Sequence, residues 1–186
     1  MCASPRQKRT PRPLDTARLD ELALAYVARF AASGAKLESY LKRKLRERGW
    51  AGEGEPPVAA IVERFVGAGY IDDAAFARMK AGSLRRRGYG ERRVGQALGA
   101  AGIAPELREE VRSSLAEQRR AAAVLARRRR FGPWGEAVER AAREKQLAAM
   151  LRAGHPQDIA RTIVHAPDIA AVESWIESAA ADEEDE

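Results

Sequence analysis

The chain has 186 residues, of which 45% are hydrophobic but only 6% aromatic, and its net charge is +6. Because much of the hydrophobic fraction is alanine, the composition disfavours one thick core and favours thin packing of helix on helix, as in an all-α protein. There is no apolar run of about 18 residues, so neither a signal peptide nor a membrane span is supported. With Cys2 as the single cysteine, a cytoplasmic protein without a membrane partner is expected.

Charge is distributed unevenly along the chain. Residues 162–186 hold eight acidic residues and no lysine or arginine, so they carry −8 and the remainder carries +14. The body is therefore far more basic than the whole, which suits a polyanionic or acidic partner.

The N-terminal segment, residues 1–15, is rich in proline and basic residues and lacks apolar periodicity, so it is predicted to be a disordered basic arm. A first helix, ending near Gly34, is then predicted from the helical spacing of Leu19, Leu22, Tyr26 and Phe30. A second carries an apolar stripe and stops at Gly49, and a third opens at Pro56 or Pro57.

This arrangement returns twice along the chain. The apolar positions of the second helix recur every 53 residues, in the sets Leu41, Val94, Leu147 and Leu45, Leu98, Leu151. Glycine stops follow at 49, at 102 and, one position early, at 154, and Pro105 and Pro156 open further third helices. The sequence therefore predicts three tandem three-helix repeats, at residues 16–70, 71–116 and 117–166, stacked into an elongated, curved body.

The first helices of the later repeats are also predicted from apolar spacing. One is capped by Asp72 and carries Phe76, Met79 and Leu84, and another begins near Glu117 and carries Val124 and Leu125. Residues 167–186 are predicted to form a short amphipathic helix with Ile169, Val172 and Ile176, followed by an acidic tail.

Three clusters of basic residues are the candidate binding residues. They are Arg85, Arg86, Arg87, Arg92 and Arg93; Arg127, Arg128, Arg129 and Arg130; and Lys42, Arg43 and Lys44. Four consecutive arginines sweep about 300° of a helix, so the end of that helix has little buried circumference. Solvated helix faces are the simplest interpretation, but the number of clusters favours contact with anionic groups.

The first cluster surrounds a Gly-Tyr-Gly turn. Gly88 is expected to end one helix and Gly90 to begin the next. Tyr89 is predicted to pack across the turn, with stacking on a base or a guanidinium as the alternative. His155 and His165 lack partners at metal-binding spacing, and no nucleophile elbow, P-loop or dinucleotide fingerprint is present. No metal site, cofactor or enzymatic activity is predicted.

The sequence resembles the RecX family, small bacterial regulators of the RecA recombinase. The resemblance rests on "LKRKLRERGW" (41–50), "GYIDDAAFARMKAGSLRRRGYGERRVGQALGAAGI" (69–103) and "EKQLAAMLRAGHPQDIARTIV" (144–164), and spans about residues 16–166. The chain departs from the family's pattern at the start of the second helix, where Leu37 and Tyr40 stand in the places that often hold Ser and Glu. That helix is therefore expected to be capped from Ser33 or Gly34.

The resemblance implies three repeats that lie in the helical groove of the RecA nucleoprotein filament and touch adjacent protomers. It implies a regulator of homologous recombination and DNA repair that mostly inhibits filament extension, ATP hydrolysis, strand exchange and the co-protease activity behind the SOS response. The basic clusters and Tyr89 are then expected to engage acidic RecA residues or phosphates. A monomer that binds single- or double-stranded DNA only weakly by itself is expected, with its acidic tail folding back on the arginines.

Two alternatives stay open from the sequence. A stand-alone helical DNA- or RNA-binding protein would bind nucleic acid tightly without a recombinase. A pure scaffold would leave the arginine runs dispensable.

Overall fold

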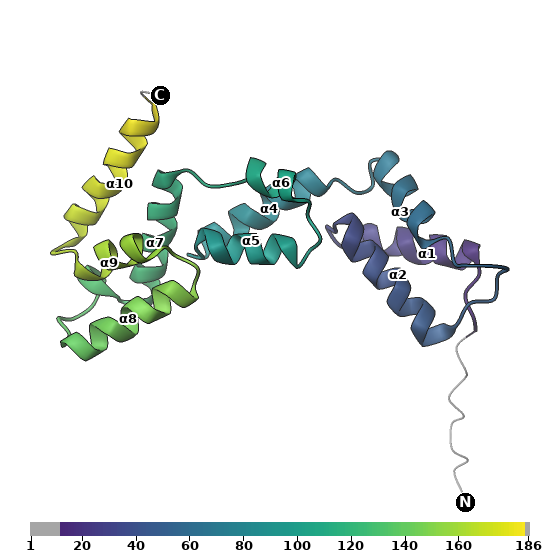
Figure 1. Cartoon of the computed structure of the whole chain (residues 1–186), viewed down its shortest axis with the longest axis horizontal. Coiled ribbons are helices and arrows are strands. Elements are labelled where there is room, and N and C mark those ends of the chain that lie inside the picture. Colours follow the sequence, from purple (N-terminus) through teal and green to yellow (C-terminus); the bar gives the residue numbers. More distant parts are fainter. Residues whose placement is uncertain (1–11, 185–186) are drawn as a thin grey trace, which may run out of the picture. The chain divides into compact units, whose positions relative to one another are not determined.

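The computed structural model describes residues 12–184, which contain ten α-helices and one short 3₁₀ helix (Figure 1). The chain divides into two compact units, one up to Asp73 and one from Ala74 onward. The predicted all-α class is confirmed. Cys2, the rest of the arm up to residue 11, and the last two acidic residues lie outside the described part.

The first unit is a three-helix bundle of α1 (Thr16–Val27), α2 (Gly34–Arg48) and α3 (Val58–Gly67). Two side chains cap its helices at their N-termini, where backbone N–H groups lack helical partners. The Asp15 carboxylate accepts from the Arg18 N–H at 2.9 Å, and the Ser33 hydroxyl accepts from the Lys36 N–H at 3.3 Å. The expected cap at Ser33 is therefore confirmed.

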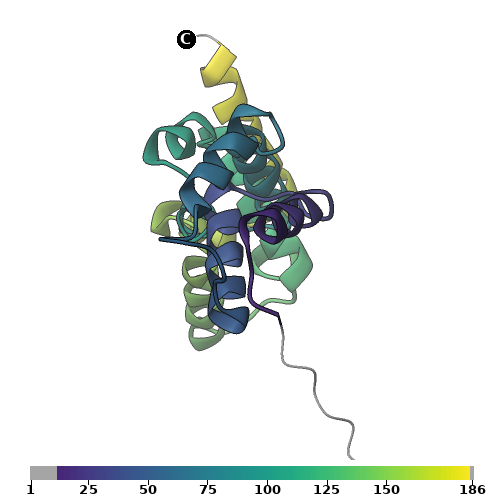
Figure 2. The same ribbon diagram turned by 90° about the vertical axis from the view of Figure 1, so that its right-hand side faces the viewer.

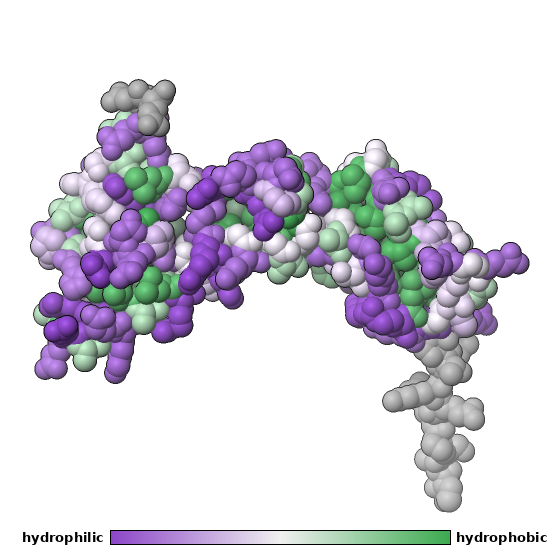
Figure 3. Space-filling model, viewed as in Figure 1, coloured by the Kyte–Doolittle hydropathy of each residue, from purple (hydrophilic) through white to green (hydrophobic). Residues whose placement is uncertain are grey.

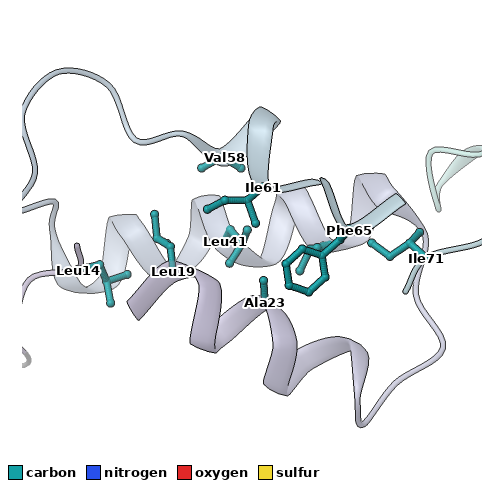
Figure 4. Packing of buried hydrophobic residues seen from close by; sticks show 9 residues of the cluster. Leu14, Leu19, Ala23, Leu41, Val58, Ile61, Phe65 and Ile71 are labelled. Carbon is teal, nitrogen blue, oxygen red and sulfur yellow. The ribbon is translucent and has the colours of Figure 1, made fainter. Parts of the chain in front are cut away.

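The core of this unit is built from one apolar stripe on each helix (Figure 4). Leu19 of α1, Leu41 of α2 and Ile61 of α3 are almost fully buried and meet in its centre. Leu14 and Ile71 add to the core from just outside the bundle's helices. The core therefore extends beyond the helices that define the bundle.

Two expectations for this unit are wrong. The first helix ends at Val27 rather than near Gly34, and Phe30 is 56% exposed, because residues after α1 must turn to bring Ser33 into its capping position. Leu14, assigned to the disordered arm, is fully buried and pairs with Trp50 through an isolated β-bridge. Its apolar side chain fills the end of the bundle, so ordered structure begins earlier than proline content suggested.

The second unit begins with α4 (Asp73–Arg86, starting at the last residue of the first unit), α5 (Glu91–Gly99) and α6 (Pro105–Glu110). Their cluster of buried residues includes Phe76 and Leu84 from α4 and Val94 and Leu98 from α5. Met79, expected on the apolar stripe, is 47% exposed because it lies on the opposite side of α4 from this cluster.

A further set of three helices follows: α7 (Leu115–Arg129), α8 (Arg140–Arg152) and α9 (Gln157–His165), with a 3₁₀ turn at Gly132–Trp134. Ser114 and Glu117 form a reciprocal capping box at the start of α7. Leu125, Met150 and Ile163 are buried in the shared core. Val124 was expected on the same apolar stripe as Leu125, but it is 40% exposed.

The last helix, α10 (Ile169–Glu184), is a 16-residue element rather than the short helix that was predicted. It runs out to the C-terminus in yellow in Figure 2 and packs against α7. Val172 and Ala179 are buried on its inner side, while Ile169 is 40% exposed. The apolar face of α10 continues past the predicted stripe, which is why the helix does not fray where its acidic residues begin.

The glycine stops show the internal repeat most directly. Gly49, Gly102 and Gly154 follow α2, α5 and α8, and all three have left-handed backbone, with φ of 80°, 72° and 98°. Only glycine adopts this conformation without steric cost. The three helix triplets predicted from the 53-residue interval are confirmed, while the elongated, curved shape stays a prediction.

No helix within residues 12–184 is both long enough and apolar enough to cross a membrane.

Candidate functional site

The Gly88-Tyr89-Gly90 elbow joins α4 to α5 in the second unit. Gly88 has φ +81°, and its N–H and that of Tyr89 donate back to the carbonyls of Arg85 and Leu84 at 2.8 and 3.1 Å. These bonds satisfy carbonyls at the end of α4. Gly90 is the N-cap of α5, so both glycines take the expected places.

The same elbow contacts the third helix triplet through its backbone. A Cβ atom on Gly88 would lie 2.7 Å from the backbone nitrogen of Leu125 in α7, and one on Gly90 would overlap the carbonyl of Gly154. The Gly90 N–H donates to the carbonyl of Ala153 at 3.0 Å. Glycine is therefore required here for close approach as well as for the turn, and the elbow is held firmly against α7 and α8.

The buried side chain of His155 stabilises this contact. Its side chain is 3% exposed, and Nε2 lies 3.0 Å from the Gly88 carbonyl, which makes Nε2–H the donor. Burial lowers the pKa of His155, and the hydrogen bond to Gly88 opposes that shift only in part. Nδ1 has no hydrogen-bond partner within residues 12–184. His155 is thus a neutral structural residue that joins two helix triplets.

A hollow of about 270 Å³ opens beside the elbow, and we call it the basic hollow. Its charged residues are Arg128 and Arg129 from the end of α7 and Arg152 from the end of α8. The other lining residues are Tyr89, Leu125, Phe131, Ala149 and Ala153. The packing of the elbow on α7 and α8 therefore brings Tyr89 together with one of the predicted arginine runs.

The arginines of the hollow are exposed, and no ion pair in the described part of the chain involves them. Arg127 and Arg130 next to them are exposed too, as the sweep of four arginines around a helix predicted. Hydrophilic side chains cover much of the visible face of this unit (Figure 3). Guanidinium groups in such a setting can bind carboxylates or phosphates through paired N–H donors.

The cluster around the elbow divides into internal and exposed residues. The Arg85 side chain is only 16% exposed, forms an ion pair with Glu91 at 3.1 Å and donates to the Val111 carbonyl. Arg92 donates to the Leu151 carbonyl across the same seam. Arg85 is thus a structural residue, contrary to the expectation that it contacts a partner, because the turn places Glu91 directly opposite it.

Arg86, Arg87 and Arg93 are exposed, and so is Arg92 despite its hydrogen bond to Leu151. The Arg87 guanidinium lies 5.4 Å from the centre of the Tyr89 ring, within the range of a cation–π contact. Tyr89 itself is half-buried and packs on the core of α4 and α5. Both interpretations of Tyr89 are thereby partly met, since it packs across the turn and also contacts a guanidinium.

The basic residues of the third predicted cluster form ion pairs within their own helix. Lys42 pairs with Glu38 at 2.6 Å, and Arg43 and Lys44 pair with Glu47 at 2.9 and 2.6 Å. These contacts also lower the pKa of Glu47, chiefly through the hydrogen bond from Lys44. The surplus positive charge of this cluster is therefore smaller than a count of its basic residues suggests.

Sequence reasoning missed Arg152. The repeat gave no signal for it, because the equivalent positions hold Arg46, which was not a candidate residue, and Gly99. The acidic tail was expected to fold back on the arginines, but Glu183 contacts the start of α7 instead. The Glu183 carboxylate accepts from the Ala116 N–H at 2.9 Å at the start of α7, and this bond lowers the pKa of Glu183. A carboxylate is favoured there by the unpaired N–H groups and the positive end of the helix dipole.

Among residues 12–184 no group of three or more His, Cys, Asp or Glu side chains is placed to hold a metal ion. The fold and the site together define an all-α protein built of three-helix repeats, with an arginine-lined hollow at the seam between its second and third repeats.

Known proteins agree with this class. The second three-helix domain of RecX matches residues 72–111. The regulatory protein RecX of Myxococcus xanthus (strain DK1622) is 33% identical over 171 residues, which cover 86% of this chain and 90% of that protein. The crystal structure of RecX from Lactobacillus salivarius superposes with a TM-score of 0.60 at 19% identity, over 80% of this chain and 94% of that one, and so supports the fold. The chain belongs to the RecX family of regulatory proteins.

Proposed function

We propose that this protein regulates the RecA recombinase by binding its nucleoprotein filament, and that it mostly inhibits filament extension, ATP hydrolysis, strand exchange and SOS co-protease activity. Membership of a family of regulatory proteins supports a regulatory role. The observation that carries the choice of an anionic partner is the set of arginines without ion pairs around the basic hollow.

In this proposal the repeats act together. Three helix triplets arranged as an elongated, curved body would contact successive protomers of a filament, and linked weak contacts of this kind bind far more tightly than each alone. Among the exposed arginines of the second unit, the proposed contact residues are Arg86, Arg87, Arg93, Arg127, Arg128, Arg129, Arg130 and Arg152. The protein acts as a cytoplasmic monomer and performs no chemistry itself.

The experiment is a titration of the protein into RecA assembled on single-stranded DNA, with ATP hydrolysis and filament length as readouts. The wild type should slow hydrolysis and shorten filaments. R128Q/R129Q should need about tenfold more protein for the same effect, equivalent to a loss of ~1.4 kcal/mol of binding free energy. The matched control K42Q/R43Q removes the same charge from ion-paired positions and should behave like the wild type.

A naked-DNA control separates the competing functions. Tight binding to DNA without RecA, and no effect on preassembled filaments, would favour a stand-alone nucleic-acid-binding protein. If R128Q/R129Q and a charge reversal at Arg86 and Arg87 both leave inhibition unchanged, the arginines are dispensable and the proposed contact surface is wrong.

A further inference from the structure

We infer that the basic hollow is a binding site for single-stranded nucleic acid, in which Arg128, Arg129 and Arg152 hold a backbone phosphate and Tyr89 supports the adjoining base. This inference deepens the proposed function, because it names the chemical group that the site takes from the nucleoprotein filament. It rests on the geometry of one seam within the second unit.

The charge of the hollow exceeds what local structure balances. Arg128 and Arg129 occupy the last turn of α7 and Arg152 the last turn of α8, where the helix dipoles favour cations. Each helix end supplies roughly half a negative charge, so about one negative charge faces three positive ones. With no ion pair to these arginines within the described residues, a surplus of about two positive charges is left for a ligand.

The walls of the hollow suit a nucleotide better than a carboxylate side chain. Between the arginines lie apolar and aromatic groups, including Tyr89, Leu125 and Phe131. A nucleotide presents a phosphate and a flat base together, and bases stack on aromatic rings in proteins that bind single strands. An acidic peptide offers the charge without the flat face. The volume of about 270 Å³ leaves room for a phosphate and part of its nucleoside.

The aromatic platform is fixed before any ligand binds. Tyr89 lies between two glycines whose backbones are in close contact with Leu125 and Gly154, and His155 holds the Gly88 carbonyl. The Arg87 guanidinium lies 5.4 Å from the centre of the Tyr89 ring and adds a further positive charge beside this residue. A preorganised site of this kind loses little side-chain freedom on binding.

The test is direct binding of a fluorescein-labelled oligothymidylate of about twelve nucleotides, followed by fluorescence anisotropy between about 25 and 200 mM salt. No recombinase is present, so failure here is distinguishable from failure of the proposed regulation. Wild-type protein should bind with an affinity that falls linearly with salt on logarithmic axes. R128Q/R152Q should flatten that slope by about 0.7, because the hollow holds one phosphate and each phosphate contact on a single strand contributes about 0.7. K42Q/R43Q, with the same net charge as this variant, should keep the wild-type slope.

Tyr89 is tested separately. Y89F keeps the ring and should bind like the wild type, whereas Y89L should bind roughly 5- to 100-fold more weakly because it cannot stack on a base. Circular dichroism and thermal melts establish that each variant is folded, and if Y89L is not, Y89F compared with Y89H provides the stacking series. The inference is overturned if R128Q/R152Q and K42Q/R43Q lose affinity equally. It is also overturned if a polyglutamate peptide binds the wild type with the same arginine dependence while the oligonucleotide does not bind.

Discussion

His155 makes the seam between two helix triplets sensitive to pH. Burial lowers its pKa below the ordinary value of 6.5, so the unfolded chain takes up a proton more readily than the folded one. The stability it confers is fully present above about pH 7 and falls as pH drops below 6.5. The slope cannot exceed about 1.4 kcal/mol per pH unit for one group.

We therefore expect wild-type protein to lose up to ~1 kcal/mol of unfolding free energy between about pH 7.5 and 5.5, measured by urea denaturation. H155Q retains an N–H donor for the Gly88 carbonyl but does not titrate, so most of this pH dependence should vanish. H165Q, at an exposed position, is the matched control for the loss of one histidine. Equal pH dependence in wild type and H155Q would show that another group is responsible.

Arg130 is strained at the end of α7. It is the one non-glycine residue with positive φ among residues 12–184, at φ 55° and ψ 49°. A side chain in this left-handed conformation costs about 1 kcal/mol relative to glycine. R130G should accordingly raise the free energy of unfolding by ~0.5–1 kcal/mol.

Two neighbouring substitutions control for charge and for glycine itself. R130A removes the guanidinium but keeps Cβ, so it should bring no gain. R129G places glycine inside the helix and should lower stability by ~0.5–1 kcal/mol. A destabilised R130G would mean that the Arg130 side chain makes a contact worth more than the backbone strain.

At the scale of elements, α10 docks on α7 through one cation–π pair as well as through apolar contacts. The Arg119 guanidinium lies 4.3 Å from the centre of the Trp175 ring and donates to the Trp175 carbonyl and to the Ser178 hydroxyl at 3.2 Å. Cation–π contacts are worth ~0.5–2 kcal/mol, most for tryptophan and when partly desolvated.

A double-mutant cycle of R119Q and W175L should therefore give a coupling energy of ~0.5–2 kcal/mol in urea unfolding. Either single substitution should lower the free energy of unfolding, and the double variant should be little less stable than the weaker of the two single variants. R120Q, an exposed arginine one position along the same helix, should show no coupling to W175L. Additive effects at Arg119 and Trp175 would mean that α10 is held by its apolar face alone.

The positions of helices were predictable from the sequence where nearby residues determine where a helix ends. The 53-residue interval located α2, α5 and α8, since each is followed within three residues by a glycine with positive φ. The role of α10 was not predictable, because its partner α7 begins more than fifty residues earlier and the Glu183–Ala116 contact exists only after folding. Loop residues such as Leu14 were misjudged for the same reason: burial at the end of a bundle has no periodic signature.

The candidate site was predictable only in part. Arginine runs are visible in the sequence, but whether a guanidinium is free depends on what lies opposite it. The pairs Lys42–Glu38 and Arg43–Glu47 could have been foreseen from their four-residue spacing on a helix. The pairing of Arg85 with Glu91 across the elbow, and the approach of Arg152 to Tyr89, depend on tertiary packing.

At the scale of the whole molecule, stability should be divided between the two units, because each has its own buried cluster. The first cluster lies entirely within residues 14–71, and the other two lie within residues 76–172. In repeat proteins stability is a sum of unit and neighbour terms, so units can open separately. Ile61, which is 2% exposed in the first core, offers a clean test.

Ile61→Ala should cost ~2–4 kcal/mol by leaving a cavity in the first core. Hydrogen exchange followed by mass spectrometry should then show faster exchange of amides in α1 to α3, with the amides of α7 to α9 unchanged. The converse substitution, Ile163→Ala, removes a fully buried side chain from the second unit and should give the opposite pattern. If either substitution accelerates exchange in all helices equally, the two units unfold as one cooperative body, and the separate cores do not define separate folding units.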